Sequence, residues 1–122
     1  MSSSDFTGVN RKEWVIDYYS LQNTGLISGS IDKVTVFTKA IGTSIIGQAD
    51  IRNILRLDGD TRQNDYGLST NWEVYGYTAN RPGRGSWTWE DIDNLQAGVG
   101  LKLNSALEAK CTLVWVEIEF TV

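Results

Sequence analysis

Two kinds of side chain in this sequence have the types and spacing to do chemistry: clustered carboxylates, and a set of tryptophans and tyrosines. The 122 residues include no histidine and a single cysteine, Cys111. Without these partners the chain has no cysteine–histidine or serine–histidine pair for nucleophilic catalysis and no thiolate zinc site. We therefore expect Cys111 to be a small packed side chain.

One polar segment gathers oxygen ligands: Asp58-Gly59-Asp60, followed by Asn64 and Asp65. Ca²⁺ prefers carboxylate and amide oxygens, so Asp58, Asp60 and Asp65 are candidate metal ligands. The segment lacks the glycine and glutamate positions of an EF-hand loop. A solvated turn is the favoured interpretation, and Ca²⁺ bound within the chain or shared between subunits is the alternative. No other cofactor is expected.

A second group of carboxylates, Glu90, Asp91 and Asp93, has the residue types of an acid–base pair. These residues fall in the first turn of a predicted helix, where negative charge complements the helix dipole. We interpret them as caps and solvated charges. The sequence therefore predicts no catalytic residue and no enzyme.

The aromatic residues are compatible with two classes of function. A carbohydrate-binding module would expose a flat aromatic platform, whereas tyrosine and tryptophan are also favoured at protein interfaces. Strand alternation places Trp115 on one face with glutamates, and Tyr75 and Tyr77 on one face with Glu73, so we expect some aromatics to lie outside the main core. Tyr75, Tyr77 and Trp115 are the candidates for a sugar platform.

Composition and charge exclude some partners. The net charge is −4 and the eleven basic residues are scattered, which argues against binding nucleic acid through its phosphates. No apolar run approaches the roughly 20 residues that cross a bilayer. The N-terminus lacks the positive charge and apolar core of a secretory signal. We expect that the protein is not exported by that route, or that its signal has been removed.

The elements that must position these residues are mostly strands. β-branched and aromatic residues alternate with polar ones over several segments, which is the period of a half-buried strand. The polar segment 58–67 is predicted to be a loop or a hairpin end. The expected strands are residues 13–21, 31–40, 48–57, 68–79, 101–103 and 109–122.

One short helix is predicted near residues 88–97. Thr88 as N-cap and Asp91 three positions later form a capping-box pattern. Ile92, Leu95 and Val99 would then face the sandwich along one side of the helix. Gly98 and Gly100 are expected to end it.

The predicted fold is all-β: a jelly-roll β-sandwich of seven or eight antiparallel strands with that one helix. A chain of this length fits one domain. Its first dozen residues are small and polar apart from Phe6 and Val9. We therefore predict a flexible N-terminal arm over residues 1–12 and a single sandwich domain over residues 13–122.

Four blocks of sequence carry a resemblance to a known family. They are residues 29–36, 68–75 and 111–117, and the most specific one, Trp87-Thr88-Trp89-Glu90-Asp91-Ile92-Asp93-Asn94-Leu95-Gln96-Ala97-Gly98-Val99. Together they resemble a jelly-roll domain that recurs in phage virion proteins and in surface proteins of archaea and bacteria. Family members often have Asn-Pro before the Trp-Thr segment, where this chain has Asn80-Arg81-Pro82. The resemblance implies a fold and a setting, and it transfers no catalytic residue.

We predict a non-enzymatic structural protein that self-assembles, because the chain reads as a small protein with no catalytic domain for a binding module to serve. It would be a capsid decoration or tail component of a phage virion, or a subunit of an extracellular tube or filament. Its partners would be copies of itself or other assembly subunits. The expected contacts are Phe6, Val9, Arg81, Arg84 and Trp87, with the arginines pairing with a partner's carboxylates. Replacing both arginines should then weaken assembly without unfolding the monomer. The alternative is a carbohydrate-binding module.

Overall fold

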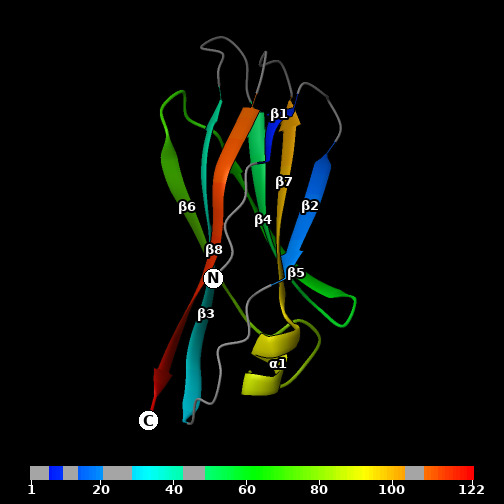
Figure 1. The fold of residues 1–122 in the computed structure, drawn as a ribbon, viewed down its shortest axis with the longest axis vertical. Helices are drawn as coiled ribbons and strands as arrows, with labels where there is room; N and C mark the ends of the chain where they lie inside the picture. Colours follow the sequence, from blue (N-terminus) through cyan, green and yellow to red (C-terminus); the bar gives the residue numbers. More distant parts are fainter. Residues whose placement is uncertain (1–5, 10–13, 21–28, 43–48, 104–108) are drawn as a thin grey trace.

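The computed structural model describes residues 6–9, 14–20, 29–42, 49–103 and 109–122, the first group by its backbone alone. These residues form two antiparallel sheets packed face to face, with one short helix at one end (Figure 1). Sheet A has the order β1 (Phe6–Val9), β8 (Ala109–Thr121), β3 (Ser30–Gly42), β6 (Glu73–Ala79). Sheet B has the order β2 (Val15–Ser20), β7 (Gln96–Leu103), β4 (Ala49–Leu57), β5 (Asp60–Gly67).

This strand order is that of a jelly roll. The chain passes repeatedly from one sheet to the other, and first and last strands lie side by side in sheet A. Two interlocked Greek keys produce this arrangement. The predicted all-β jelly-roll sandwich is therefore confirmed, with eight strands among the described residues.

Strand alternation explains the core between the sheets. In β3 the inward residues Val34, Val36, Thr38 and Ala40 are buried, and β8 contributes buried residues that alternate with more exposed ones. Strand β7 is buried along most of its length. Burial of apolar area of this kind is the main stabilising contribution to such a fold. The cysteine Cys111 is among these buried side chains, as predicted.

A polar bridge joins the sheets inside this core. Asn53 of β4 is fully buried and accepts a hydrogen bond from the hydroxyl of Thr38 at 2.7 Å. Its amide donates to the carbonyl of Tyr75 at 2.9 Å and to that of Val36 at 3.3 Å. Buried polar groups that are paired in this way help to specify one arrangement of the two sheets.

The polar segment 58–67 is a strand rather than a loop. Strand β5 pairs with β4 through a two-residue turn, Asp58-Gly59, in which both residues have positive φ. This is the conformation of a type I′ hairpin, which Asp-Gly favours. Because β5 is an edge strand exposed along almost its whole length, it has no apolar alternation to reveal it.

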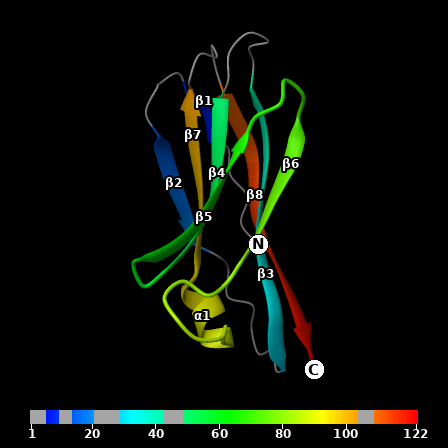
Figure 2. The same ribbon diagram turned by 180° about the vertical axis from the view of Figure 1, so that it is seen from behind.

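The helix is shorter than predicted. Helix α1 spans Trp89–Asn94, and the chain then enters β7 at Gln96. Val99 is a buried residue of that strand and not part of the helix, and Gly98 and Gly100 lie in the strand as well. Helix α1 lies at one end of the sandwich, as Figure 2 shows from behind. Ile92 and Leu95 are buried, as expected.

The N-terminal segment contributes a strand to the sandwich. The backbone of β1 pairs with β8, with Phe6 opposite Cys111 and Val9 opposite Ala109. Phe6 and Val9, which were assigned to the arm, therefore belong by their backbone to sheet A. The rest of the predicted arm, residues 1–5 and 10–12, lies outside the described residues.

In the described part of the chain, no helix has the length and apolar character needed to cross a membrane.

Candidate functional site

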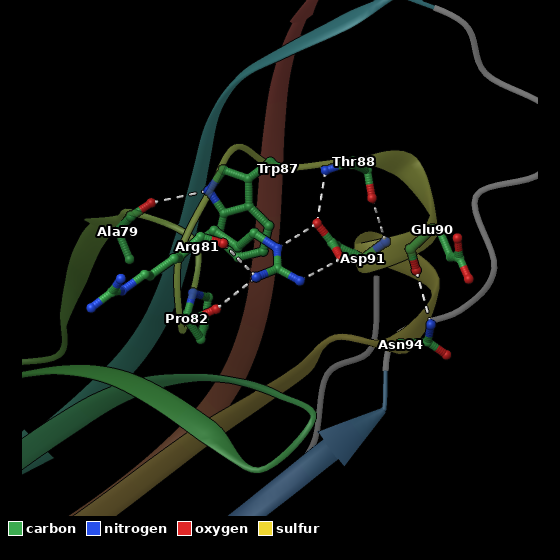
Figure 3. Close-up of polar contacts among 9 residues, drawn as sticks. Ala79, Arg81, Pro82, Trp87, Thr88, Glu90, Asp91 and Asn94 are labelled. Carbon is green, nitrogen blue, oxygen red and sulfur yellow. Dashed lines mark hydrogen bonds and ion pairs between the residues drawn. The ribbon is translucent and has the colours of Figure 1, made fainter.

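Arg81 organises the loop that leads from β6 to the helix (Figure 3). Its guanidinium binds the carboxylate of Asp91 in a bidentate ion pair, at 2.8 and 3.2 Å. It also donates to the carbonyl of Arg84 at 2.7 Å and to that of Pro82 at 3.2 Å. Planar guanidinium groups are suited to such multiple contacts. The side chain is 24% exposed and is already occupied within its own chain.

The carboxylate that Arg81 binds also caps the helix. Asp91 accepts from the backbone N–H of Thr88 at 2.9 Å, and the Thr88 hydroxyl accepts from the Asp91 N–H at 3.2 Å. The predicted capping box is therefore confirmed. Burial would raise the pKa of Asp91, but the hydrogen bonds from Arg81 and Thr88 outweigh burial and lower this pKa below its ordinary value.

Two tryptophans hold this loop against the sandwich. The indole N–H of Trp87 donates to the carbonyl of Ala79 at 3.3 Å, and that of Trp89 donates to the carbonyl of Gly29 at 3.0 Å. Trp89 also meets the ring of Phe120 edge to face, with 5.3 Å between ring centroids. Both indoles are half-buried and fixed in orientation.

The surface between this loop and the start of β3 is hollowed. Two adjoining hollows, of about 400 and 470 Å³, share Ile31, Ser86 and Trp87. One extends toward Asn80 and the end of β6, and the other toward Trp89. We call the two together the Trp87 groove. Ligand sites commonly have volumes of about 300–1,000 Å³ and combine aromatic walls with a few polar groups.

The rim of the Trp87 groove carries free polar side chains. Asn80 and Ser86 are exposed, and neither side chain has a hydrogen-bond partner among the described residues. Indole rings present an apolar face, while amide and hydroxyl groups donate and accept hydrogen bonds. The groove is therefore suited to a ligand that has both an apolar face and several hydroxyl groups.

The three sugar-platform candidates do not lie together. Trp115 is on the outer face of sheet A, where it stacks on Phe37 with 5.2 Å between centroids and 15° between planes. Tyr75 and Tyr77 are on the opposite face and pack against the core. Phe37 was missed because its pairing with Trp115 depends on the register of two distant strands.

The three metal candidates are also separated. Asp58 is in the hairpin turn and Asp60 directly follows it, whereas Asp65 lies five residues farther along β5 and forms a bidentate ion pair with Arg52. Within the described ranges, no group of three histidine, cysteine or acidic residues could hold a metal ion.

The interface candidates lie in two places. Arg81, Arg84 and Trp87 belong to the loop beside the groove, and Arg84 is exposed there. Phe6 and Val9 lie in β1, the edge strand of sheet A beside β8. The structure therefore brings the three loop residues together and leaves the two β1 residues apart from them.

Aromatic rings also lie on the outer face of sheet B, beneath cationic side chains. The guanidinium of Arg52 is 4.0 Å from the ring centroid of Trp14, and that of Arg56 is 5.0 Å from Tyr18. Cations over ring faces are attracted by the ring quadrupole. Because these cations already occupy the rings, this face is a poorer platform for a ligand than the groove.

Comparisons with known proteins bear on the fold. No protein-family model matches the chain, and no curated protein matches it. A solved structure described as "CBM4 structure and function" is similar, with a TM-score of 0.50 and 14% sequence identity. The match covers 87% of this chain and 61% of that one, so this chain spans less than two thirds of its neighbour's length. At this identity the likeness shows the β-sandwich fold, which this chain shares with a carbohydrate-binding module.

Proposed function

We propose that this protein is a non-catalytic carbohydrate-binding domain and that the Trp87 groove is its binding site. The observation that carries the proposal is the meeting of two fixed indoles around a hollow with the side chains of Asn80 and Ser86, which have no hydrogen-bond partner among the described residues. A pyranose ring has an apolar face that stacks on an aromatic ring and hydroxyl groups that need donors and acceptors. The sandwich fold that the chain shares with a carbohydrate-binding module supports the same choice.

The indoles are arranged to receive a ligand without rearrangement. Each indole N–H is already bonded to a backbone carbonyl, so the ring orientation is set before binding. Arg81 holds the loop through Asp91, Pro82 and Arg84, which fixes the position of Ser86 beside the groove. A preorganised site of this kind loses less entropy when a ligand binds.

A glycan array followed by calorimetry tests the proposal. The probes are oligosaccharides of glucose, xylose, mannose and N-acetylglucosamine, and acidic glycans on the same array. For the best ligand, the double variant Asn80→Ala/Ser86→Ala should raise Kd by roughly thirtyfold. Two hydrogen bonds contribute about 1 kcal/mol each, and about 1.4 kcal/mol is tenfold in Kd.

Replacing Asn80 and Ser86 should change ligand binding without changing the stability of the fold. Asn80 and Ser86 make no side-chain hydrogen bond with any described residue, so the thermal unfolding midpoint should not change. The matched control is Gln63→Ala on the exposed strand β5, which should leave both Kd and the midpoint unchanged. An array with no ligand, or an unaltered Kd in the double variant, would contradict the proposal.

The second candidate function is self-assembly, as a phage virion component or as a subunit of an extracellular tube or filament. The observation that favours it is the exposed apolar surface on the outer face of sheet A, around Phe37 and Trp115. Either function would suit a virion or an extracellular surface assembly. Electron microscopy of the purified protein, with and without Ca²⁺, would show rings, tubes or filaments if this candidate holds.

A further inference from the structure

The outer face of sheet A exposes an aromatic patch that nothing in the described part of the chain covers completely. Phe37 and Trp115 stack at its centre across the β3–β8 pair. Beside them, Leu113 is 37% exposed and Val74 is 53% exposed. Contiguous exposed apolar surface of this kind marks a site of contact with another molecule.

Where residues 33–39 of β3 pair with residues 113–119 of β8, the charged side chains on this face are sorted by strand, and Lys110 lies on β8 beyond this stretch. The outward residues of β3 include Lys33 and Lys39, and those of β8 include Glu117 and Glu119. Lys33 lies directly opposite Glu119 in the register, as Phe37 lies opposite Trp115. Of the residues that the structure describes, none is within ion-pair distance of these four groups.

This sorting makes the face complementary to itself. Consider two copies whose outer faces of sheet A meet across a two-fold axis. If the axis lies between the copies, parallel to the strands and above the β3–β8 pair, β3 of one copy lies over β8 of the other. Trp115 then lies over Phe37 of the second copy, and Glu119 lies over its Lys33. Face-to-face sheets pack with their strand directions within about 30° of each other, which fits an axis along the strands.

We propose that the protein forms a two-fold dimer through the outer face of sheet A, with the occupant of the patch being a second copy of this chain. A two-fold interface requires one surface that contains both members of each contacting pair. This face contains both members of the aromatic pair, Phe37 and Trp115, and both members of the charge pair, Lys33 and Glu119. The interface would have an apolar centre and a charged rim, as stable interfaces do.

Sedimentation equilibrium in the absence of glycan tests the proposal. Lys33→Glu and Glu119→Lys should each raise the dimer dissociation constant at least about tenfold, because each single reversal opposes like charges across the interface. The double reversal Lys33→Glu/Glu119→Lys should return the constant to near that of the original protein. Gln63→Glu, on the outer face of sheet B, is the matched control and should have no effect.

A variant at the centre of the patch completes the experiment. Trp115→Ala should leave a monomer, with circular dichroism showing that the sandwich is still folded. A protein that is monomeric at every concentration, or a dimer unaffected by both single reversals, would overturn the proposal. If the original protein is a monomer and its Trp115→Ala variant no longer binds glycan, the proposal is also overturned, because the patch is then a sugar platform. Since mass is measured without glycan, the sedimentation outcomes do not depend on ligand binding in the Trp87 groove.

Discussion

Arg81 ties three neighbouring features of the molecule together: the loop after β6, the start of helix α1 and the edge of the Trp87 groove. Its guanidinium makes four hydrogen bonds, two of them to the buried carboxylate of Asp91. The side chain is therefore not free to pair with a partner's carboxylate. We therefore expect that replacing Arg81 and Arg84 together lowers the stability of the folded monomer, through the loss of the Arg81 contacts.

The two arginines should respond differently to replacement. Arg81→Ala leaves the Asp91 carboxylate without its guanidinium partner, so the thermal unfolding midpoint should fall. Arg81→Lys should restore only part of the loss, because an ammonium group cannot form the bidentate pair. Arg84 is exposed and contributes only its backbone carbonyl to this network, so Arg84→Ala should have almost no effect. Thermal unfolding followed by circular dichroism compares the three variants, and equal midpoints for Arg81→Ala and Arg84→Ala would refute this role of Arg81.

Asp91 should make stability depend on pH in the acid range. Its pKa is lowered in the folded protein, so the stability it contributes is complete above the ordinary pKa of about 3.9. That contribution is lost as the pH falls through the lowered folded pKa. Urea unfolding from about pH 5 down to about pH 2 should therefore show a steeper loss of stability in the original protein than in Asp91→Asn. Parallel curves for the two proteins would mean that Asp91 is not the titrating group.

At the scale of elements, Asn53 connects the two sheets through buried hydrogen bonds. Asn53→Leu removes the acceptor for the buried Thr38 hydroxyl, and should cost on the order of 3 kcal/mol of unfolding free energy. The double variant Thr38→Val/Asn53→Leu should be more stable than the single one, because no buried hydroxyl is then left without an acceptor. Chemical denaturation measures both free energies. If the double variant is no more stable than Asn53→Leu, the hydrogen bond from Thr38 does not explain the contribution of Asn53 to stability.

Local patterns predicted most of the elements. The capping box of Thr88 and Asp91 was predictable because it depends on residues three positions apart. Strands β3, β4 and β8 were predictable because each has one buried face. Strand β5 was missed because both of its faces are polar, although the Asp58-Gly59 turn is a strong hairpin signal that would have revealed it.

Contacts between distant residues were not predictable. Gly98 and Gly100 resemble helix stop signals, yet in β7 they make room for the ring of Tyr18 on β2 and for that of Trp14 just before β2. A Cβ atom at Gly98 would lie 2.8 Å from the Tyr18 ring. The same limit applies to the candidate site, since the Arg81–Asp91 pair and the hollow beside Trp87 arise only when loop, helix and β3 meet.

At the scale of the whole molecule, the two proposed surfaces lie on different parts of the sandwich. The Trp87 groove is lined by the loop before helix α1 and by the start of β3, and the aromatic patch is on the outer face of sheet A. Helix α1 lies at one end of the sandwich (Figure 1). The groove and the patch adjoin at Lys33, which lines the groove and belongs to the charged rim of the patch. A dimer would therefore place Glu119 of the second copy near the edge of the groove.

Four of the five tryptophans lie on separate surfaces of the sandwich, and the fifth, Trp72, is exposed just before β6. Trp87 and Trp89 line the groove, Trp115 lies in the patch, and Trp14 lies on the outer face of sheet B. Each tryptophan has one indole N–H, so a ¹⁵N-labelled sample should give one indole signal for each.

The most direct test of carbohydrate binding in the groove is an NMR titration of these indole signals with the best glycan from the array. We predict that the Trp87 and Trp89 signals shift with increasing glycan, while the Trp14 and Trp115 signals stay in place. If no indole signal moves, or if only Trp14 or Trp115 responds, the Trp87 groove is not a carbohydrate-binding site.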